Sequence, residues 1–213
     1  MREILIATGN PGKFREIAAV LSEESSPVPA VRWLSLSDLP QPIVEPPEDG
    51  ETFVENAILK ARYYSRASGF WTLADDSGLE VDALGGAPGV RSARYAQVND
   101  GSPREIVDKA NNAKLIGNLA GIPAEQRTAR FCCALVLTDG PQVLATAEGA
   151  IEGRIIDSPR GTGGFGYDPH FLIPELGKTT AELPAQEKNR ISHRGRALRA
   201  MRDRLVVLLA EKT

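Results

Sequence analysis

Two adjacent carboxylates, Asp75 and Asp76, directly follow an apolar run that ends at Ala74. Like charges this close repel each other, and burial would penalise both, although a loop could carry them in water. Successive residues of a strand point to opposite faces, so one carboxylate can face a ligand while its neighbour bonds elsewhere. Carboxylate oxygens at the end of a strand are natural ligands of a hard cation such as Mg²⁺. The pair therefore indicates a metal site, with a solvated surface turn as the alternative.

A second candidate is the stretch IATGNPGKFREI, residues 6–17. A short buried strand, a turn at Asn10 and a proline at position 11 predict the start of a helix that runs to about Ser22. The first turn of such a helix has N–H groups that can face an anion. Lys13 is slightly unfavourable there for the helix itself, which indicates a partner such as phosphate. The alternative is an ordinary capped helix with a solvated lysine.

The third candidate is a glycine-dense loop. Gly161–Gly166 holds four glycines in six positions, more than a simple turn requires. Glycine permits a close approach of a ligand to the backbone, and Phe165 and Tyr167 could stack on a planar base. The alternative is a flexible hairpin end whose aromatic rings fold back onto the core.

Basic side chains form the fourth candidate, just before and within the last predicted helix. A cation near a helix N-terminus is unfavourable for the helix, so a binding role is indicated for Arg194. For Arg190 and Arg196 a solvated charge is the simpler interpretation. The basic residues of this span are Lys188, Arg190, His193, Arg194 and Arg196.

The elements that must position these residues are mixed strands and helices, which predicts an α/β (mixed) fold. The segment 40–47 is the one candidate hinge or long loop. The expected strands are 4–7, 72–74 leading into the acidic pair, Ala129–Thr138 and 143–150 around a hairpin at Asp139-Gly140, and Phe171–Ile173. The expected helices start at Asn10, at Glu51 or Thr52 with Lys60 in the apolar stripe, at a capping box Ser102–Glu105 with a stop near Gly121, and at Ser192.

The composition is that of an ordinary globular chain: 213 residues, 42% hydrophobic and 25% charged. No apolar run is long enough to span a bilayer, and the N-terminus lacks a signal-peptide layout, so we expect a cytoplasmic location and no membrane partner. The net charge of −3 argues against polymeric nucleic acid as a partner. Adjacent Cys132 and Cys133 suit neither a disulfide nor a metal site, and we expect two buried apolar fillers in a reducing compartment.

In this order, the motifs resemble those of the inosine triphosphatase (XTP/dITP diphosphatase) family of purine nucleoside triphosphate pyrophosphatases. The resemblance covers nearly the whole chain. The matching pieces are TGNPGK at Thr8–Lys13, EDGETFVENAILKA at Glu48–Ala61, ADDSGLEVDALGGAPGVRSARY at Ala74–Tyr95, GTGGFGYDPHF at Gly161–Phe171 and EKNRISHRGRAL at Glu187–Leu198.

The resemblance implies a single catalytic domain over residues 1–213, with an elongated central mixed β-sheet flanked by helices and two lobes with an active-site cleft between them. It also implies Mg²⁺-dependent hydrolysis of ITP, dITP and XTP to the nucleoside monophosphate and pyrophosphate, which removes deaminated purines from the nucleotide pool. Members of the family are usually homodimers.

The resemblance further implies a role for each matching residue. Asp76 would be the general base and a metal ligand, with Glu48 as a second metal ligand. Ser77 would contact substrate. The triphosphate would be held by Thr8, Gly9, Asn10, Pro11, Gly12, Lys13 and Lys60, the base or sugar would be surrounded by Phe165, Gly166, Tyr167 and Asp168, and the purine would be reached by Lys188, His193 and Arg194.

Two other classes of protein remain alternatives. A serine hydrolase would use Ser77 or Ser92 with His193, but no GxSxG elbow surrounds either serine. A nucleotide sensor would keep the phosphate and base sites, but it would have little use for Asp76 beside a metal. Pyrophosphate release from ITP separates these interpretations.

Overall fold

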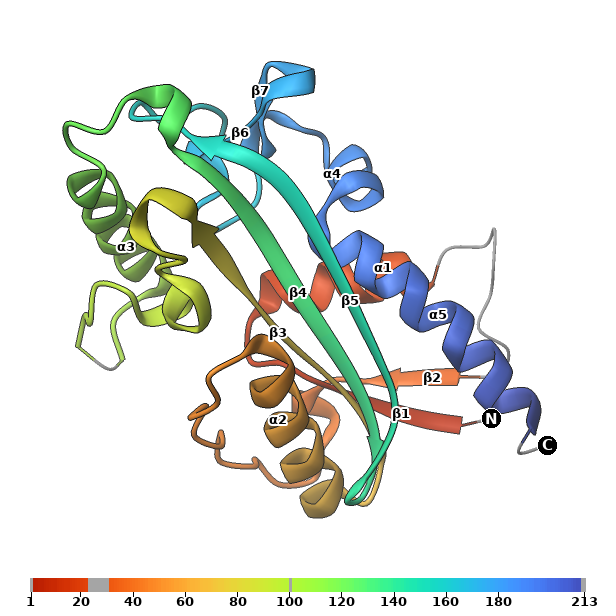
Figure 1. The fold of residues 1–213 in the computed structure, drawn as a ribbon. Helices are drawn as coiled ribbons and strands as arrows, with labels where there is room; N and C mark the ends of the chain where they lie inside the picture. Colours follow the sequence, from red (N-terminus) through yellow and green to blue (C-terminus); the bar gives the residue numbers. More distant parts are fainter. Residues whose placement is uncertain (1, 23–30, 100, 212–213) are drawn as a thin grey trace. The chain divides into compact units, whose positions relative to one another are not determined.

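The computed structural model describes residues 2–22, 31–99 and 101–211, and its strands form one seven-stranded sheet in the order β2-β1-β3-β4-β5-β6-β7 (Figure 1). The strands are β1 Arg2–Ala7, β2 Val31–Leu34, β3 Trp71–Val81, β4 Thr128–Asp139, β5 Gln142–Ile155, β6 Phe171–Ile173 and β7 Lys178–Thr179. The α-helices are α1 Pro11–Leu21, α2 Phe53–Ser68, α3 Arg104–Asn118, α4 Ala185–Ile191 and α5 His193–Glu211. Among the described helices, none combines the length and the apolarity that crossing a membrane needs.

The chain divides into two compact units. The first unit comprises Met1–Asp76, Cys133–Gly149 and His193–Thr213. The second comprises Ser77–Cys132 and Ala150–Ser192. Three strands, β3, β4 and β5, contribute residues to both units.

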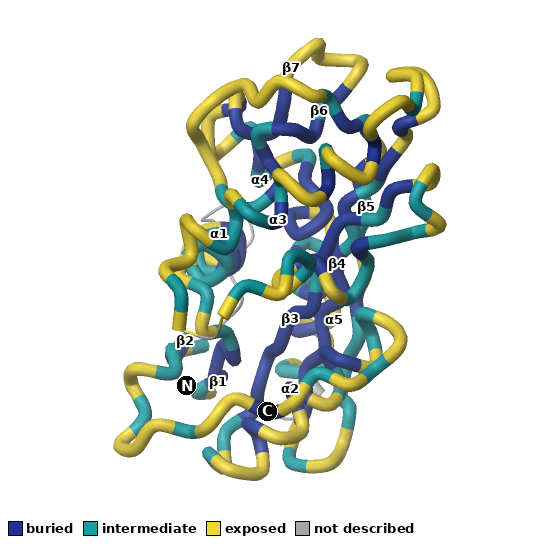
Figure 2. The backbone as a smooth tube through the Cα atoms, turned by 90° about the vertical axis from the view of Figure 1, so that its left-hand side faces the viewer, coloured by how far each residue is buried: buried dark blue, intermediate teal, exposed yellow. Residues whose placement is uncertain are grey.

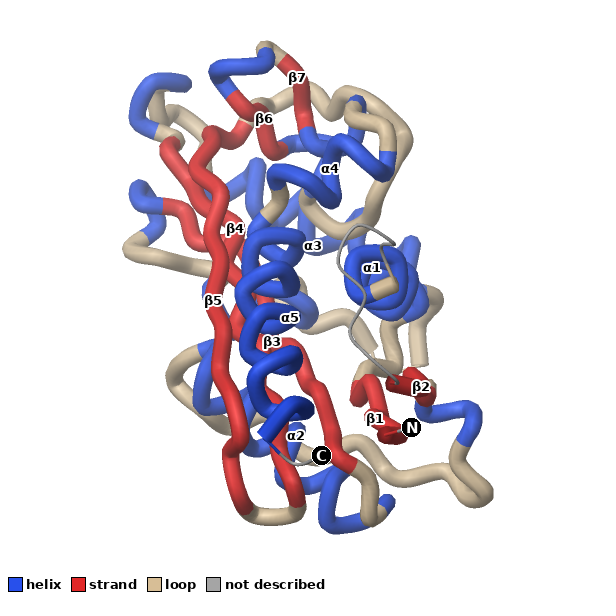
Figure 3. The backbone as a smooth tube through the Cα atoms, turned by 90° about the vertical axis from the view of Figure 1, so that its right-hand side faces the viewer, coloured by secondary structure: helices blue, strands red, loops and turns tan. Residues whose placement is uncertain are grey.

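In the first unit the central strands are buried on both faces, as parallel strands usually are. β1 pairs in parallel with β2 and with β3, where Ala7 lies opposite Ala74. Leu73 packs in a core cluster with residues of α1 and α5, whereas Ala74 packs in a second cluster with residues of α2. Figure 3 shows α1 and α5 on one side of these strands and α2 behind them. The alternation of the strand therefore decides which helices each β3 side chain meets.

Side chains cap α1 and α2, two of the helices that carry candidate residues. Asn10 Oδ1 accepts from the backbone N–H groups of Gly12, at 2.8 Å, and of Lys13, at 3.3 Å, which confirms Asn10 as the cap of α1. Thr52 and Glu55 form a capping box at the start of α2, with both hydrogen bonds at 3.2 Å. These caps fix the helix starts, and so they fix which α1 and α2 side chains face the sheet.

The second unit has its own core. Phe131 on β4 and Phe171 on β6 lie with ring centroids 4.5 Å apart, and Leu115 on α3 packs in the same cluster. β6 pairs antiparallel with both β5 and β7. Figure 2 shows β3 and β4 as mostly buried, β5 as largely intermediate and most connecting loops as exposed. The glycine-dense loop precedes the short 3₁₀ helix Asp168–His170, which leads directly into β6.

Several predicted boundaries were wrong. β3 does not end before the acidic pair but continues through it to Val81. Ser102 does not cap α3, which begins at Arg104 without a capping side chain and ends at Asn118 rather than near Gly121. Local patterns did not reveal β2, β7 or α4, which are too short to show a clear hydrophobic period. The segment 40–47 has no helix or strand, as predicted.

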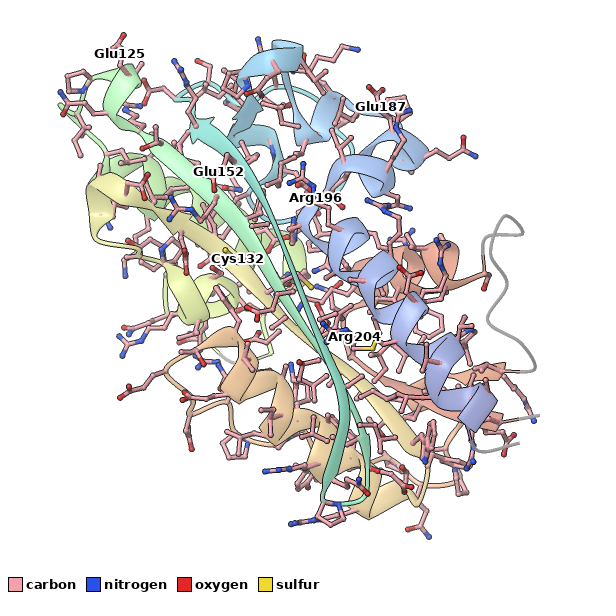
Figure 4. All side chains as sticks on the ribbon, turned by 45° about the vertical axis from the view of Figure 1, so that its right-hand side comes forward. Glu125, Cys132, Glu152, Glu187, Arg196 and Arg204 are labelled. Atoms are coloured by element: carbon pink, nitrogen blue, oxygen red, sulfur yellow. The ribbon has the colours of Figure 1, made fainter. Side chains whose placement is uncertain are left out.

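The adjacent cysteines are both free thiols. Cys133 is buried in the core of the first unit, as predicted, and burial raises the pKa of its thiol to about 12. Cys132 is only half-buried, which corrects the prediction of two buried fillers. Figure 4 labels Cys132 on β4 and Glu152 on β5. Burial, together with the charges of Glu80 and Glu152, also raises the pKa of Cys132 to about 12, so neither thiol is an activated nucleophile.

Candidate active site

Asp75 and Asp76 lie within β3 and are almost completely buried, with 1% and 5% of their surfaces exposed. Since Leu73 faces α1 and α5 while Ala74 faces α2, strand alternation directs Asp75 to the first face and Asp76 to the second. The hydrogen-bond partners agree, because Asp75 meets residues of α1 and α5 and Asp76 meets α2. Opposite faces thus let two adjacent acids stay buried without sharing one pocket.

Asp75 is surrounded by cations. Its Oδ2 atom lies 3.2 Å from Lys13 Nζ and 3.3 Å from both Nε and Nη2 of Arg194. The remaining terminal nitrogen of Arg194, Nη1, forms an ion pair with Glu16. Burial alone would raise the pKa of Asp75, but the charges of Lys13, Arg194 and Lys60 hold that pKa below its usual range. Asp75 is therefore a permanent anion that fixes two cations.

Asp76 has a different environment. Asn56 on α2 donates from Nδ2 to Asp76 Oδ2 over 3.1 Å. Burial raises the pKa of Asp76 to about 6. The nearby charge of Glu48 adds to this rise, and the attraction of Lys13 and Lys60 does not offset it. A carboxylate with a pKa this close to neutrality is ionised at neutral pH yet basic enough to take a proton.

Lys60 lies between the acidic groups. It is buried in the α2 stripe, forms an ion pair with Glu48, and has Nζ 3.4 Å from the backbone oxygen of Asp75. Burial lowers the pKa of Lys60, but Glu48, Asp75 and Asp76 together raise it above its usual value. The charged residue in an otherwise apolar stripe is thus held by carboxylates of the first unit.

Asp76 and Glu48 are the two carboxylates that were predicted to hold a divalent metal. Within the described ranges, no cluster of three or more His, Cys, Asp or Glu side chains forms a ready-made metal cage. Mg²⁺, however, is usually bound by one or two carboxylates and completes its octahedron with waters and substrate phosphates. Two carboxylates beside the ammonium group of Lys60 fit that requirement.

The stretch Thr8–Lys13 partly departs from the expected anion site. The helix start is where it was predicted, but the N–H groups of Gly12 and Lys13 already donate to Asn10 Oδ1. Asn10 N in turn donates to Thr8 Oγ1 over 3.2 Å. Two of the amides that were expected to face a ligand therefore have an acceptor within the chain, and the Lys13 ammonium group has a carboxylate.

A second cluster lies in the second unit. The carboxylate of Asp168 accepts from Lys188 Nζ at 2.6 Å, from Phe165 N at 2.8 Å and from Thr180 Oγ1 at 2.7 Å. Lys188 Nζ also lies 5.1 Å from the centroid of the Phe165 ring, a cation–π distance. Gly164 has φ +73°, and a Cβ there would lie 2.0 Å from Asp168 Oδ2, so only glycine fits this turn. The cluster combines an aromatic face with a buried ion pair.

The other predicted site residues are placed as follows. Tyr167 is buried and donates from its hydroxyl to Ser92 O over 2.8 Å. Ser92 Oγ is bonded to Leu79 N at 2.8 Å and to Gly89 O at 2.6 Å, a structural role rather than that of a nucleophile. His193 is buried in the first turn of α5, and Ser77 is half-buried in β3.

Several residues that contact the predicted ones were missed, among them Asn56, Glu16 and Thr180. Asn56 precedes Lys60 by four positions, and this helical spacing was a usable signal. Glu16 and Thr180 gave no signal, because each meets a partner distant in the sequence: Arg194 for Glu16 and Asp168 for Thr180. In the first unit, an open cavity of about 590 Å³ contains none of the predicted site residues; it is lined by Leu144, Ala145, Ala200, Asp203, Arg204, Val207 and Leu208.

Comparisons with known proteins agree on one family. A model of the Ham1 family matches residues 4–204. The dITP/XTP pyrophosphatase of Geobacter sulfurreducens is 50% identical over 206 residues, covering 96% of this chain and 97% of the relative. The dITP/XTP pyrophosphatase of Thermus thermophilus is 47% identical over 199 residues, covering 93% of this chain and 89% of the relative.

Solved structures have the same fold. A HAM1 protein from Coxiella burnetii superposes with a TM-score of 0.80 at 37% identity, covering 99% of this chain and 100% of the other. The Staphylococcus aureus Ham1 protein gives a TM-score of 0.79 at 36% identity and covers 100% of both chains. The predicted α/β (mixed) fold with a central mixed sheet flanked by helices is confirmed.

Proposed function

The chain belongs to the Ham1 family, and we propose that it hydrolyses dITP, XTP and ITP, with Mg²⁺, to the nucleoside monophosphate and pyrophosphate. Relatives about half identical to it over most of the chain are dITP/XTP pyrophosphatases. One observation carries the proposal: a buried carboxylate with a raised pKa, Asp76, is oriented by Asn56 beside the charges of Lys13, Lys60 and Glu48. Such an enzyme removes deaminated purines from the nucleotide pool.

In the proposed mechanism, Asp76 accepts the proton of the attacking water. Asn56 keeps the carboxylate in one orientation by its hydrogen bond to Oδ2. Mg²⁺, held by Asp76 and Glu48, would supply charge neutralisation and acidify water. Lys13 and Lys60 offset the charge on the phosphates, with Lys13 anchored by Asp75 and Lys60 by Glu48. Phosphoryl transfer depends mostly on such positioning and charge neutralisation.

The rest of Thr8–Lys13 is proposed to hold the triphosphate. An incoming phosphate would compete with Asn10 Oδ1 for the N–H groups of Gly12 and Lys13. A phosphate carries more charge than an amide oxygen, so the helix N-terminus favours the exchange of Asn10 Oδ1 for phosphate. Ser77 is also proposed to contact the substrate.

Base choice is proposed to depend on Phe165–Asp168 and on the cations Lys188, His193 and Arg194. Inosine and xanthine have a 6-keto oxygen that accepts a hydrogen bond, whereas adenine has a 6-amino group that donates one. A site built to donate to the keto oxygen can discriminate by roughly 10⁴ or more. Arg194 is held by Asp75 and Glu16 in the present structure, so its contact with the base stays a prediction.

The decisive test is to incubate the protein with XTP, dITP, ITP and ATP in the presence of Mg²⁺ and to measure pyrophosphate and orthophosphate separately. We expect pyrophosphate from the first three substrates and little from ATP, and none after chelation by EDTA. Orthophosphate alone would indicate a different phosphatase. Bound but intact XTP would indicate a nucleotide sensor.

We also propose a homodimer in the cytoplasm. The location is supported by the two free thiols, Cys132 and Cys133, which persist in reducing compartments. The dimer is supported only by the resemblance of the motifs. Light scattering on the purified protein distinguishes a particle of twice 22.9 kDa from a monomer.

A further inference from the structure

Helix α3 holds the glycine-dense loop of the second unit at a single residue. Asp108 Oδ2 accepts from Gly166 N over 2.9 Å, and Asn112 Nδ2 donates to Gly166 O over 2.9 Å. Asp108 and Asn112 are four positions apart on α3, so both side chains project from one face of the helix. Both backbone groups of Gly166 are thus bonded to side chains of one helix.

The residue before Gly166 is Phe165, whose ring meets Lys188. The N–H group of Phe165 donates to Asp168 Oδ2 over 2.8 Å. Phe165 is therefore fastened through its own amide on one side and through Gly166 on the other. With both flanking peptides fixed, the direction in which its side chain leaves the backbone is fixed as well.

Helix α3 is itself braced within the same unit. Asn111 is buried, accepts from Ala96 N at 2.7 Å and donates to Ser92 O at 3.3 Å. Ser92 O also accepts from the Tyr167 hydroxyl at 2.8 Å. The adjacent pair Asn111 and Asn112 therefore connects two loops, and the helix gives the glycine-dense loop a rigid support.

We propose that Asp108 and Asn112 form a clamp on Gly166 that positions Phe165 against the purine base and so strengthens binding of the base. The inference rests on the proposed function, which places the base beside Phe165. Asp108 and Asn112 are positioning residues, because they act through the loop and touch no substrate. Without the clamp, Phe165 would have to be ordered when the nucleotide binds, which costs binding free energy.

The main test is Asn112→Leu, which keeps the shape of the side chain and removes the donor to Gly166 O. Among the described residues, Asn112 Oδ1 is buried without a hydrogen-bond partner, so leucine also removes that cost and the fold should persist. We expect KM for XTP and ITP to rise roughly threefold to tenfold, as loss of one ordering hydrogen bond predicts, with a smaller change in kcat. The inhibition constant of inorganic tripolyphosphate, which has no base, should not change.

Three further variants sharpen the test. Asn118→Leu makes the same substitution on α3 at a residue bonded to the Tyr95 hydroxyl and not to the loop, and it should leave KM unchanged. Asp108→Ala should raise KM as Asn112→Leu does, whereas Asp108→Asn, whose amide oxygen can still accept from Gly166 N, should restore most of the affinity. Asn112→Ser, too short to reach Gly166, replaces Asn112→Leu if the leucine variant does not fold.

An unchanged KM in the Asn112 variants would overturn the clamp. An equal rise of KM for XTP and of the tripolyphosphate inhibition constant would overturn it too, since the effect would then not act through the base. If the wild-type protein released no pyrophosphate, the proposed function would fail separately. In that case, calorimetry would measure the dissociation constants of XTP and tripolyphosphate for the wild-type protein and for Asn112→Leu. The substitution should change the dissociation constant of XTP and not that of tripolyphosphate.

Discussion

Asn56 donates from Nδ2 to Oδ2 of Asp76 over 3.1 Å, and this bond joins the first turn of α2 to a buried carboxylate of β3. The capping box at Thr52 sets the start of α2, so the helix presents Asn56 and, one turn later, Lys60 to the same region. A buried carboxylate with one fixed oxygen keeps its other oxygen in a defined direction. This relationship is the basis of the first prediction.

Asp76→Asn should abolish most pyrophosphate release from XTP. Loss of a general base typically costs about 10² to 10⁴ in rate, and loss of a metal ligand adds to this. Because asparagine is nearly isosteric with aspartate, circular dichroism and the elution volume should match the wild-type protein. Near-full activity of the variant on XTP would remove Asp76 from the proposed role.

The same substitution should change the pH dependence of stability in metal-free protein. The pKa of Asp76 in the folded protein, about 6, lies above its ordinary value of 3.8, so the ionised form destabilises the fold. That penalty is fully present above pH 6 and disappears as the pH falls toward 4, since the folded state then binds the extra proton. Asp76→Asn should therefore be more stable than wild type at pH 7.5 in EDTA, and its advantage should shrink between pH 6 and pH 4. Urea unfolding at several pH values measures this, and a constant difference would contradict it.

Asp75→Asn should act mainly on stability. It removes the anion that pairs with Lys13 and with the buried Arg194, whose guanidinium keeps its ion pair with Glu16. Breaking a buried pair by removing one partner costs about 3 kcal/mol. Urea unfolding at neutral pH should show this loss for Asp75→Asn but not for Asp76→Asn. Equal stabilities of the two variants would show that the Asp75 network contributes little.

Lys13→Ala should weaken the binding of triphosphates whatever their base. KM for XTP and for ITP should rise by similar factors, with some loss of kcat if the contact tightens in the transition state. Lys109→Ala, at an exposed position of α3, is the matched control and should behave as wild type. A rise in KM that differed strongly between the two bases would place Lys13 elsewhere in the site.

Arg194→Ala tests base choice. If Arg194 reads the 6-keto edge, the ratio of kcat/KM for ITP over ATP should fall tenfold for about each 1.4 kcal/mol of lost discrimination. Equal losses on ITP and ATP would instead indicate that Arg194 acts through Asp75 and the phosphate site. Arg196→Ala, at the exposed α5 position that Figure 4 labels, is the control and should leave the ratio unchanged.

The sequence by itself determined most of the local structure. Asn10-Pro11 and the box at Thr52 mark helix starts because a cap needs only neighbouring residues, and the long strands follow from their own apolar runs. It also predicted that Asp75 and Asp76 can face opposite sides if the strand includes them, since that alternation is a property of the extended backbone. The motifs further indicated the family, because their order along the chain is specific even where each one is weak.

Only the tertiary structure decided which side chains distant in the sequence contact each other. Arg194 meets Asp75 across 119 positions of the chain, and Asn112 meets Gly166 across 54. Periodicity tells which face a side chain occupies, but the packing of distant elements decides what lies opposite, and burial there sets the pKa. Asp75 and Asp76 are neighbours of the same type, yet one stays ionised among cations while burial raises the pKa of the other to about 6. That difference comes from α1 and α5 on one face of β3 and α2 on the other.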